Sequence, residues 1–281
     1  MSERTHIADE GDVDRLLDRL WRNGFLTGLV CAHLFWAVLI WVASNASGAE
    51  VVSTQNFIVR ADGDFAATIA NNAESMRTSL AVEWLGRELP PWRDKCPITV
   101  HANPHVGAGG TTAFSFSGSE PSGWDMRLQG SRELILNSVL PHEITHTIFA
   151  THFRRPLPRW ADEGACITIE DANEQRKYSA KLYDYLTTRR GIAFNEMFAM
   201  TEYPRDVLPL YAQGHSLARY LLNHDGGKRH FVNYLAAGMS ATWTEAGKTH
   251  YGYENLSHLQ TDWLEWVRKG SPVTTIALSP S

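Results

Sequence analysis

Several features are scarce or missing in this sequence of 281 residues. It has three cysteines and no CxxC pair, which argues against a zinc site built from thiolates. It has no run or stripe of basic residues and a formal charge of −5 at pH 7, so a nucleic-acid partner is not expected. Internal repeats and low-complexity tracts are also missing. What is present is 43% hydrophobic residues with 10 Trp and 11 Phe, enough for a folded chain with a sizeable core.

An apolar segment near the N-terminus predicts membrane targeting. Residues 25–42 carry no formal charge, follow Arg15, Arg19 and Arg22, and precede small residues at 47–49 that offer a cleavage site. Their length lies between that of a signal-peptide core and that of a spanning helix. We therefore expect a cytoplasmic n-region at 1–24 and a signal peptide or membrane anchor at 25–49. The rest is expected outside the cytoplasm, in contact with a membrane only if this segment stays uncleaved.

Residues 50–281 are predicted to form one α+β domain, with a small mixed sheet followed by a mainly helical part. A helix is expected at 64–89, and the stretch 103–123 is rich in Gly, Ser, Thr and Pro, which predicts a loop. The segment 124–129 is expected to be an edge strand. The other expected strands are 56–60 and 97–101, and the later helices are 138–152, 158–172, 174–190, 209–223, 228–238 and 256–269.

Two cysteines, Cys96 and Cys166, lie in this part of the chain. An oxidising compartment permits a disulfide bond between them. Their separation gives no spacing signal, and buried free thiols are common. The sequence therefore leaves a bridge open.

His142, Glu143 and His146 form the pattern HExxH. Residues four apart on a helix share a face, so both imidazoles can reach one ion at about 2.0–2.1 Å while the glutamate flanks it. The helix itself is favoured by an apolar stripe and by Asn137 or Ser138 as its N-cap. We predict one zinc ion per chain at this site.

Two histidines leave a zinc ion short of ligands. Glu163 is the favoured third ligand, seventeen positions after His146, with Pro156 and Pro158 between them as expected for two helices joined by a turn. Asp162 is the rival. It points about 100° away from Glu163 on a helix, so only one of the two carboxylates faces the metal.

The segments HEITH and RWADEGACITIE resemble the HExxH and W-x-x-E-G elements of the gluzincin metallopeptidases, most nearly the peptidase MA-like group, over roughly residues 56–269. The resemblance implies a zincin-like metallopeptidase domain with zinc on His142, His146 and Glu163. It also implies Glu143 as general base, in a cleft under an edge strand that binds extended peptide. The GAMEN-type exopeptidase motif is missing, which favours an endopeptidase.

Stabilising an oxyanion requires a further hydrogen-bond donor. Tyr211 and His215 lie one turn apart on a later helix, and gluzincins place a Tyr or His donor after the third ligand. Packing of both rings in the core is an equally good interpretation.

These observations predict an extracytoplasmic zinc-dependent endopeptidase whose partner is a peptide or protein substrate. The alternative is a zinc-stabilised cell-surface binding or scaffold module whose catalysis has decayed, and Glu143 argues against it, since such a module has no use for a general base. A hydrolase of a non-peptide bond would use the same ligands.

Overall fold

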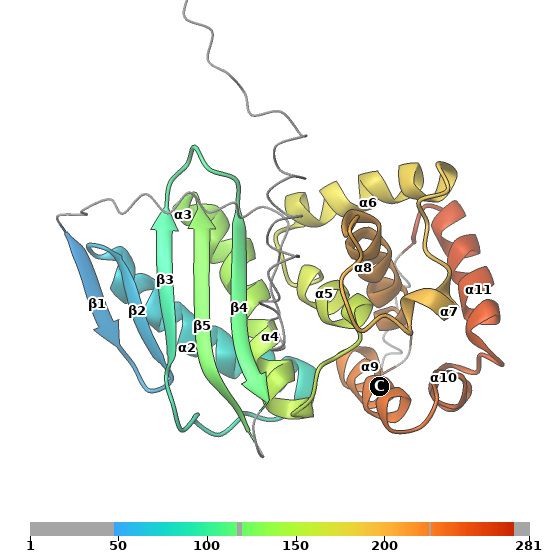
Figure 1. Cartoon of the computed structure of the whole chain (residues 1–281), viewed down its shortest axis with the longest axis horizontal. Helices are drawn as coiled ribbons and strands as arrows, with labels where there is room; N and C mark the ends of the chain where they lie inside the picture. The colour runs from blue at the N-terminus through green and yellow to red at the C-terminus, as the bar shows by residue number, and fades with distance from the viewer. Residues whose placement is uncertain (1–47, 117–119, 225, 273–281) are drawn as a thin grey trace, which may run out of the picture.

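The computed structural model describes residues 48–116, 120–224 and 226–272 (Figure 1). The predicted targeting segment, 25–42, lies outside the described residues, as does the n-region before it. Among the residues that are described, no helix has both the length and the apolar character needed to cross a membrane.

A five-stranded mixed sheet occupies the first part of the described chain (Figure 1). The strand order is β1-β2-β3-β5-β4; β2, β3 and β5 run parallel, and each outer strand pairs antiparallel with its neighbour. This confirms the small mixed sheet expected from the sequence. The strands are β1 (Ala49–Ser53), β2 (Phe57–Asp62), β3 (Cys96–Ala102), β4 (Gly109–Phe116) and β5 (Pro121–Gly130).

The sheet edge differs from the expectation. The predicted edge strand at 124–129 lies within β5, which is paired on both sides, and the predicted loop at 103–123 contains β4, which forms the edge. Glycines and small polar residues give β4 the composition of a loop, but Thr112 and Phe114 alternate onto its buried face. Pairing with β5 therefore outweighs the low strand propensity of this segment.

Two long helices, α2 (Phe65–Leu85) and α4 (Leu140–Phe153), lie against the sheet (Figure 1). Trp84 of α2 is fully buried and packs edge-on against Phe149 of α4 at 5.1 Å between ring centroids. The same indole lies 6.1 Å from Phe231, which belongs to the helical part of the chain. The core is therefore continuous between the sheet and the later helices.

The helix that carries the HExxH residues starts earlier than expected. Ser131 accepts a hydrogen bond from the Leu134 amide, and the chain is helical from there on. Asn137 and Ser138 are therefore interior residues, and the prediction of either as N-cap was wrong. The Ser138 hydroxyl instead accepts from the amide of Asp171 at 3.0 Å. The segment comprises α3 (Arg132–Leu134), a π-helical turn η1 (Ile135–Val139) and α4.

The end of α4 is close in sequence to the next helix. Arg154 has a left-handed backbone with φ of 55°, and its amide bonds to the Ala150 carbonyl at 3.0 Å, closing the helix. Pro156 and Pro158 then lead directly into α5 (Arg159–Ile167). The turn expected between the two motif helices is confirmed.

The rest of the described chain is helical, which confirms the α+β class. The expected helices are present, although the one expected at 158–172 ends at Ile167, and short helices at 194–197 and 243–251 were not expected. After α5 they are α6 (Ala172–Thr187), α7 (Phe194–Met197), α8 (Leu208–Leu222), α9 (Gly227–Ser240), α10 (Trp243–Tyr251) and α11 (Leu256–Arg268).

Helices α5 and α8 touch through their backbones. A Cβ on Gly164 would lie 2.3 Å from the carbonyl oxygen of Gly214, and a Cβ on Gly214 would lie 2.5 Å from that of Trp160. Only glycine fits at either position. The glycine of W-x-x-E-G thus brings α8 directly beside the helix that carries Glu163.

The two cysteines of the described chain are free thiols. Cys96 lies on β3 and Cys166 on α5, and both side chains are fully buried. The disulfide bond that the sequence left open is not formed.

Candidate metal centre

The two histidines of HExxH face each other on α4. His142 and His146 are both buried, and their Nε2 atoms lie 3.2 Å apart. One helical turn separates them, as the four-residue spacing requires.

Each imidazole is held on its other side by a carboxylate. His142 Nδ1 lies 2.6 Å from Glu170 Oε1, and His146 Nδ1 lies 2.8 Å from Asp162 Oδ1. A carboxylate only accepts, so Nδ1 is the nitrogen that donates in each bond. A neutral ring then presents the lone pair of Nε2, which is the arrangement that orients histidines toward metals.

Glu163 completes a triangle of donor atoms. Its Oε2 lies 3.7 Å from His142 Nε2 and 3.9 Å from His146 Nε2, and its side chain is 1% exposed. The structure thus brings together the three residues predicted as ligands. Asp162, the rival, is turned to the far side of the His146 ring, where it binds Nδ1.

A second donor set shares both histidines. His142, His146 and Cys166 are buried with ligand atoms within 4.8 Å of one another and could hold a metal ion. The Cys166 sulfur lies 3.4 Å from His146 Nδ1, the nitrogen that also faces Asp162. Burial raises the pKa of the Cys166 thiol well above its ordinary value, which disfavours the thiolate that binds metals.

Acidic neighbours also govern the protonation of His142. Burial lowers the pKa of its imidazole, but the neighbouring carboxylates of Glu163 and Glu170 outweigh burial and raise the pKa well above its ordinary value. The site therefore attracts positive charge. A proton and a metal ion compete for the same nitrogen.

Glu143 is clamped by the edge strand. It is 1% exposed, and its Oε2 accepts a hydrogen bond from the Thr112 hydroxyl at 2.7 Å. Two residues earlier on the same face of β4, a Cβ on Gly110 would lie 2.5 Å from Glu143 Oε1. The absence of a side chain at Gly110 thus makes room for the carboxylate, and Thr112 fixes its orientation.

The two predicted oxyanion donors have different surroundings. Tyr211 is 7% exposed, and burial first, then the negative charge of Glu163, raises the pKa of its phenol well above its ordinary value. His215 is fully buried, and its Nε2 bonds with Gln175 at 3.3 Å. Burial lowers the pKa of His215 to about 3, so its ring stays neutral at neutral pH.

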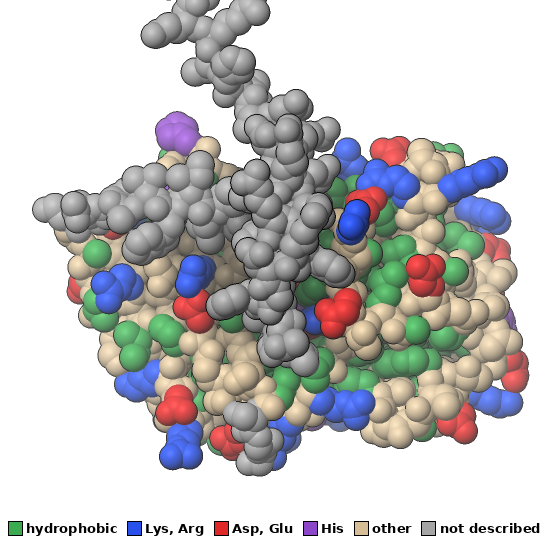
Figure 2. Space-filling model, viewed as in Figure 1, with side chains coloured by type: hydrophobic (Ala, Val, Ile, Leu, Met, Phe, Trp, Pro, Cys, Tyr) green, Lys and Arg blue, Asp and Glu red, His purple; other side chains and the backbone are tan. Residues whose placement is uncertain are grey.

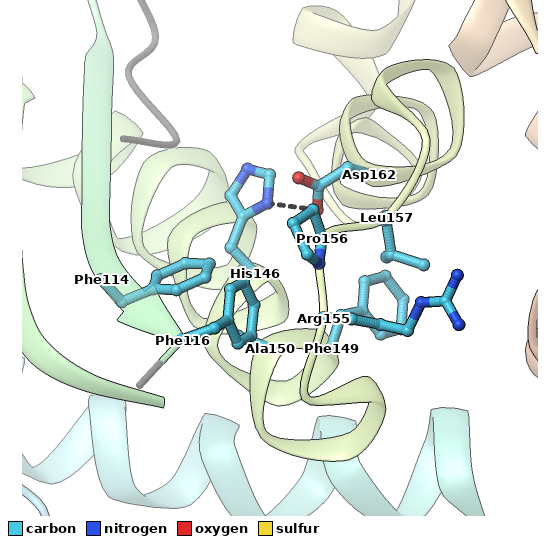
Figure 3. Close-up of a pocket in the computed structure, with 9 residues that line it drawn as sticks. All are labelled: Phe114, Phe116, His146, Phe149, Ala150, Arg155, Pro156, Leu157 and Asp162. Carbon is cyan, nitrogen blue, oxygen red and sulfur yellow. Dashed lines mark hydrogen bonds and ion pairs between the residues drawn. The ribbon is translucent and has the colours of Figure 1, made fainter. Parts of the chain in front are cut away.

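A small pocket adjoins the site. Phe114 reaches from β4 toward α4 beside His146, while Asp162 approaches the imidazole from α5 (Figure 3). Phe116 and Leu157 add apolar walls, and Arg155 and Asp162 add polar ones, so the pocket next to His146 is of mixed character.

Sequence reasoning missed three side chains of this site: Thr112, Glu170 and Tyr203. The Tyr203 hydroxyl donates to Glu163 Oε1 at 2.5 Å. Burial first, and then Glu163, raises the pKa of Tyr203 well above its ordinary value, so the phenol keeps its proton. No sequence pattern pointed to any of the three, although Glu170 ends the segment RWADEGACITIE that carries the W-x-x-E-G element.

Charged side chains give no further indication of a partner on the face that Figure 2 shows. Lys and Arg are interspersed with Asp and Glu over its coloured part. Comparison with protein-family models and with curated proteins finds no match for this chain.

Proposed function

We propose that this chain is a zinc-dependent endopeptidase with a zincin-like domain, acting outside the cytoplasm. The observation that carries the proposal is the convergence of His142 Nε2, His146 Nε2 and Glu163 Oε2, with Glu143 next in sequence on the same helix. The extracytoplasmic location rests on the apolar N-terminal segment of the sequence.

The donor atoms fit a tetrahedral ion. Atoms bound at about 2.0–2.1 Å in a tetrahedron lie roughly 3.3 Å apart. The three separations here are 3.2, 3.7 and 3.9 Å, so small side-chain adjustments would satisfy one ion. Two imidazoles and one carboxylate form the ligand set of catalytic zinc sites in peptidases. In this set, a carboxylate also binds the Nδ1 atom of each histidine. The Cys166 sulfur lies beside the same His146 Nδ1 that binds Asp162, so ligation by Cys166 at that nitrogen would disrupt the bond to Asp162.

Zinc bound there would supply a Lewis acid for a water molecule and a substrate carbonyl. Glu143 accepts the proton of the attacking water and passes it to the leaving amine. The Thr112 hydroxyl donates a hydrogen bond to Oε2 of that carboxylate, and this bond fixes the direction of the other oxygen, Oε1. Tyr211, buried and protonated, is the favoured donor to the developing oxyanion, and the neutral His215 is the second candidate.

The edge strand β4 supports a peptide substrate. Its outer side has no neighbouring strand among the described residues, and its Gly110 and Thr112 lie against Glu143. An extended peptide that adds to this edge would pass the general base. Phe114 and Phe116 on the same strand offer contacts for apolar side chains of the substrate.

Cleavage profiling tests the proposal. The purified protein is incubated with a library of peptides, with and without a zinc chelator, beside the variant Glu143→Gln. We expect internal cleavage that the chelator and the variant both abolish. Zinc uptake without cleavage of any peptide would overturn the peptidase assignment and favour the binding-module alternative.

A further inference from the structure

The three proposed ligands have hydrogen-bond partners of different kinds. Each histidine is oriented by a carboxylate, but the third donor, Glu163, has two oxygens that could both turn toward an ion. One oxygen faces the histidines, and the other accepts the Tyr203 hydrogen bond at 2.5 Å. The Glu163 carboxylate therefore directs one oxygen toward the histidines and the other toward Tyr203.

Helix α5 itself holds Tyr203 in place. The Arg159 guanidinium stacks over the Tyr203 ring at 4.4 Å, and its Nε donates to the Thr201 carbonyl at 3.2 Å. Arg159 and Glu163 lie one turn apart on α5. The helix face that presents the carboxylate therefore also contacts the loop before α8, at Thr201 and Tyr203. Tyr203 consequently reaches Glu163 across forty positions of sequence.

We propose that Tyr203 is a positioning residue, which holds Glu163 so that only one of its two carboxylate oxygens faces the metal. This inference rests on the proposed metal site. With Oε1 engaged by the phenol, only Oε2 turns to the two imidazoles, and a three-ligand set remains open for one further group. Without the phenol, Oε1 is released and the carboxylate can rotate to present both oxygens.

Metal binding tests this role without any substrate. The full chain and Tyr203→Phe are compared in zinc affinity, by competition with a chelating dye, and in the visible spectrum of the cobalt(II)-substituted protein. We expect zinc affinity to fall by about 10- to 100-fold, the effect usual for loss of an outer partner. We also expect weaker cobalt absorption, because a second carboxylate oxygen raises the coordination number and five-coordinate cobalt absorbs less than four-coordinate cobalt.

Tyr185→Phe is the matched control. Arg190 stacks over the Tyr185 ring at 4.6 Å, as Arg159 does over Tyr203, but this tyrosine lies in α6 and faces no ligand. We expect both metal readouts to be unchanged. If Tyr203→Phe does not fold, Arg159→Met loosens the tyrosine without altering it and should shift both readouts in the same direction.

The outcomes separate the two proposals. Unchanged affinity and an unchanged cobalt spectrum in folded Tyr203→Phe would overturn the positioning role and leave the peptidase proposal standing. A wild-type chain that binds zinc but cleaves nothing would overturn the peptidase, while the metal readouts still decide the role of Tyr203. A Glu163→Ala variant with full zinc affinity would overturn both.

Discussion

Gly164 and Gly214 meet backbone to backbone where α5 crosses α8. The contact leaves no room for a Cβ on either residue, since a Cβ on Gly164 would fall 2.3 Å from the Gly214 carbonyl oxygen. One glycine follows the proposed third ligand, and the other lies between the two candidate oxyanion donors, Tyr211 and His215. Their approach sets how far these donors lie from the metal ligands.

Gly164→Ala should therefore damage stability and site together. Forcing a methyl group into this contact costs about 1–3 kcal/mol of unfolding free energy, as overpacking usually does. Thermal unfolding measures the loss, and zinc affinity should fall with it as α5 shifts. Gly107→Ala is the control, because nothing lies within 4 Å of a Cβ there. Equal stability of the two variants would contradict the packing role.

Glu143→Gln and Glu163→Ala should fail in different ways. The amide at 143 keeps the side-chain shape and all three ligands, so zinc content stays near one per chain while hydrolysis falls steeply, because an amide cannot accept the proton. Removing Glu163 takes away a ligand and should reduce both zinc affinity and zinc-dependent thermal stability. Metal analysis and melting curves distinguish them. Full zinc in Glu163→Ala would exclude Glu163 as a ligand and favour the set of His142, His146 and Cys166, because Asp162 faces the far side of the His146 ring.

Thr112→Val should impair turnover and spare metal binding. The change removes the hydrogen bond to Glu143, and one hydrogen bond to a charged group contributes about 1.5–3 kcal/mol. We expect kcat to fall by about 10- to 100-fold with little change in KM or zinc content. Thr112→Ser keeps the hydroxyl and should retain most of the rate. A serine variant as slow as the valine variant would refute the orienting role.

Tyr211→Phe tests the oxyanion donor. Loss of one such donor costs about 10²-fold or more in turnover. Zinc content should stay constant, because Tyr211 is not among the three donors of the triangle. Steady-state kinetics beside metal analysis gives both values, and an unchanged kcat would leave Tyr211 as a packing residue.

His215 should make the fold sensitive to acid. Its pKa is about 3 when folded, against about 6.5 in an unfolded chain, so the unfolded state binds more protons between these values. Stability from the neutral ring is complete above pH 6.5 and is lost as the pH falls toward 3. At pH 4 the loss is on the order of 3 kcal/mol. Urea unfolding at pH 7 and pH 4 should show a smaller drop for His215→Gln than for His258→Gln, which changes an exposed histidine.

The sequence predicts those residues of the site that lie close together along the chain. His142, His146 and Glu163 follow from helical spacing and one short turn, and these relationships are contained in neighbouring residues. Thr112 meets Glu143 across 31 positions, and Tyr203 meets Glu163 across 40. Such contacts depend on strand order and helix packing, which no local pattern encodes.

The fold shows the same division. Most helices with a clear apolar period were predicted to within a few residues, although the HExxH helix begins at Arg132 rather than at 138. The composition of β4, in contrast, predicted a loop. A strand of glycine, serine and threonine is defined by its partner rather than by its own composition, because pairing with β5 satisfies its backbone. The identity of the edge strand, β4, was therefore not predicted from the sequence.

The short connection from Arg154 to Pro158 has a consequence for how the protein assembles. All three donors of the triangle lie between positions 142 and 163, so the two helices that carry them can meet with little loss of chain entropy. Closing the loop between these two helices therefore costs the chain less entropy than bringing Phe57 of β2 beside Cys96 of β3, so the three ligands of the proposed metal site come together at a lower cost than these parallel strands of the sheet.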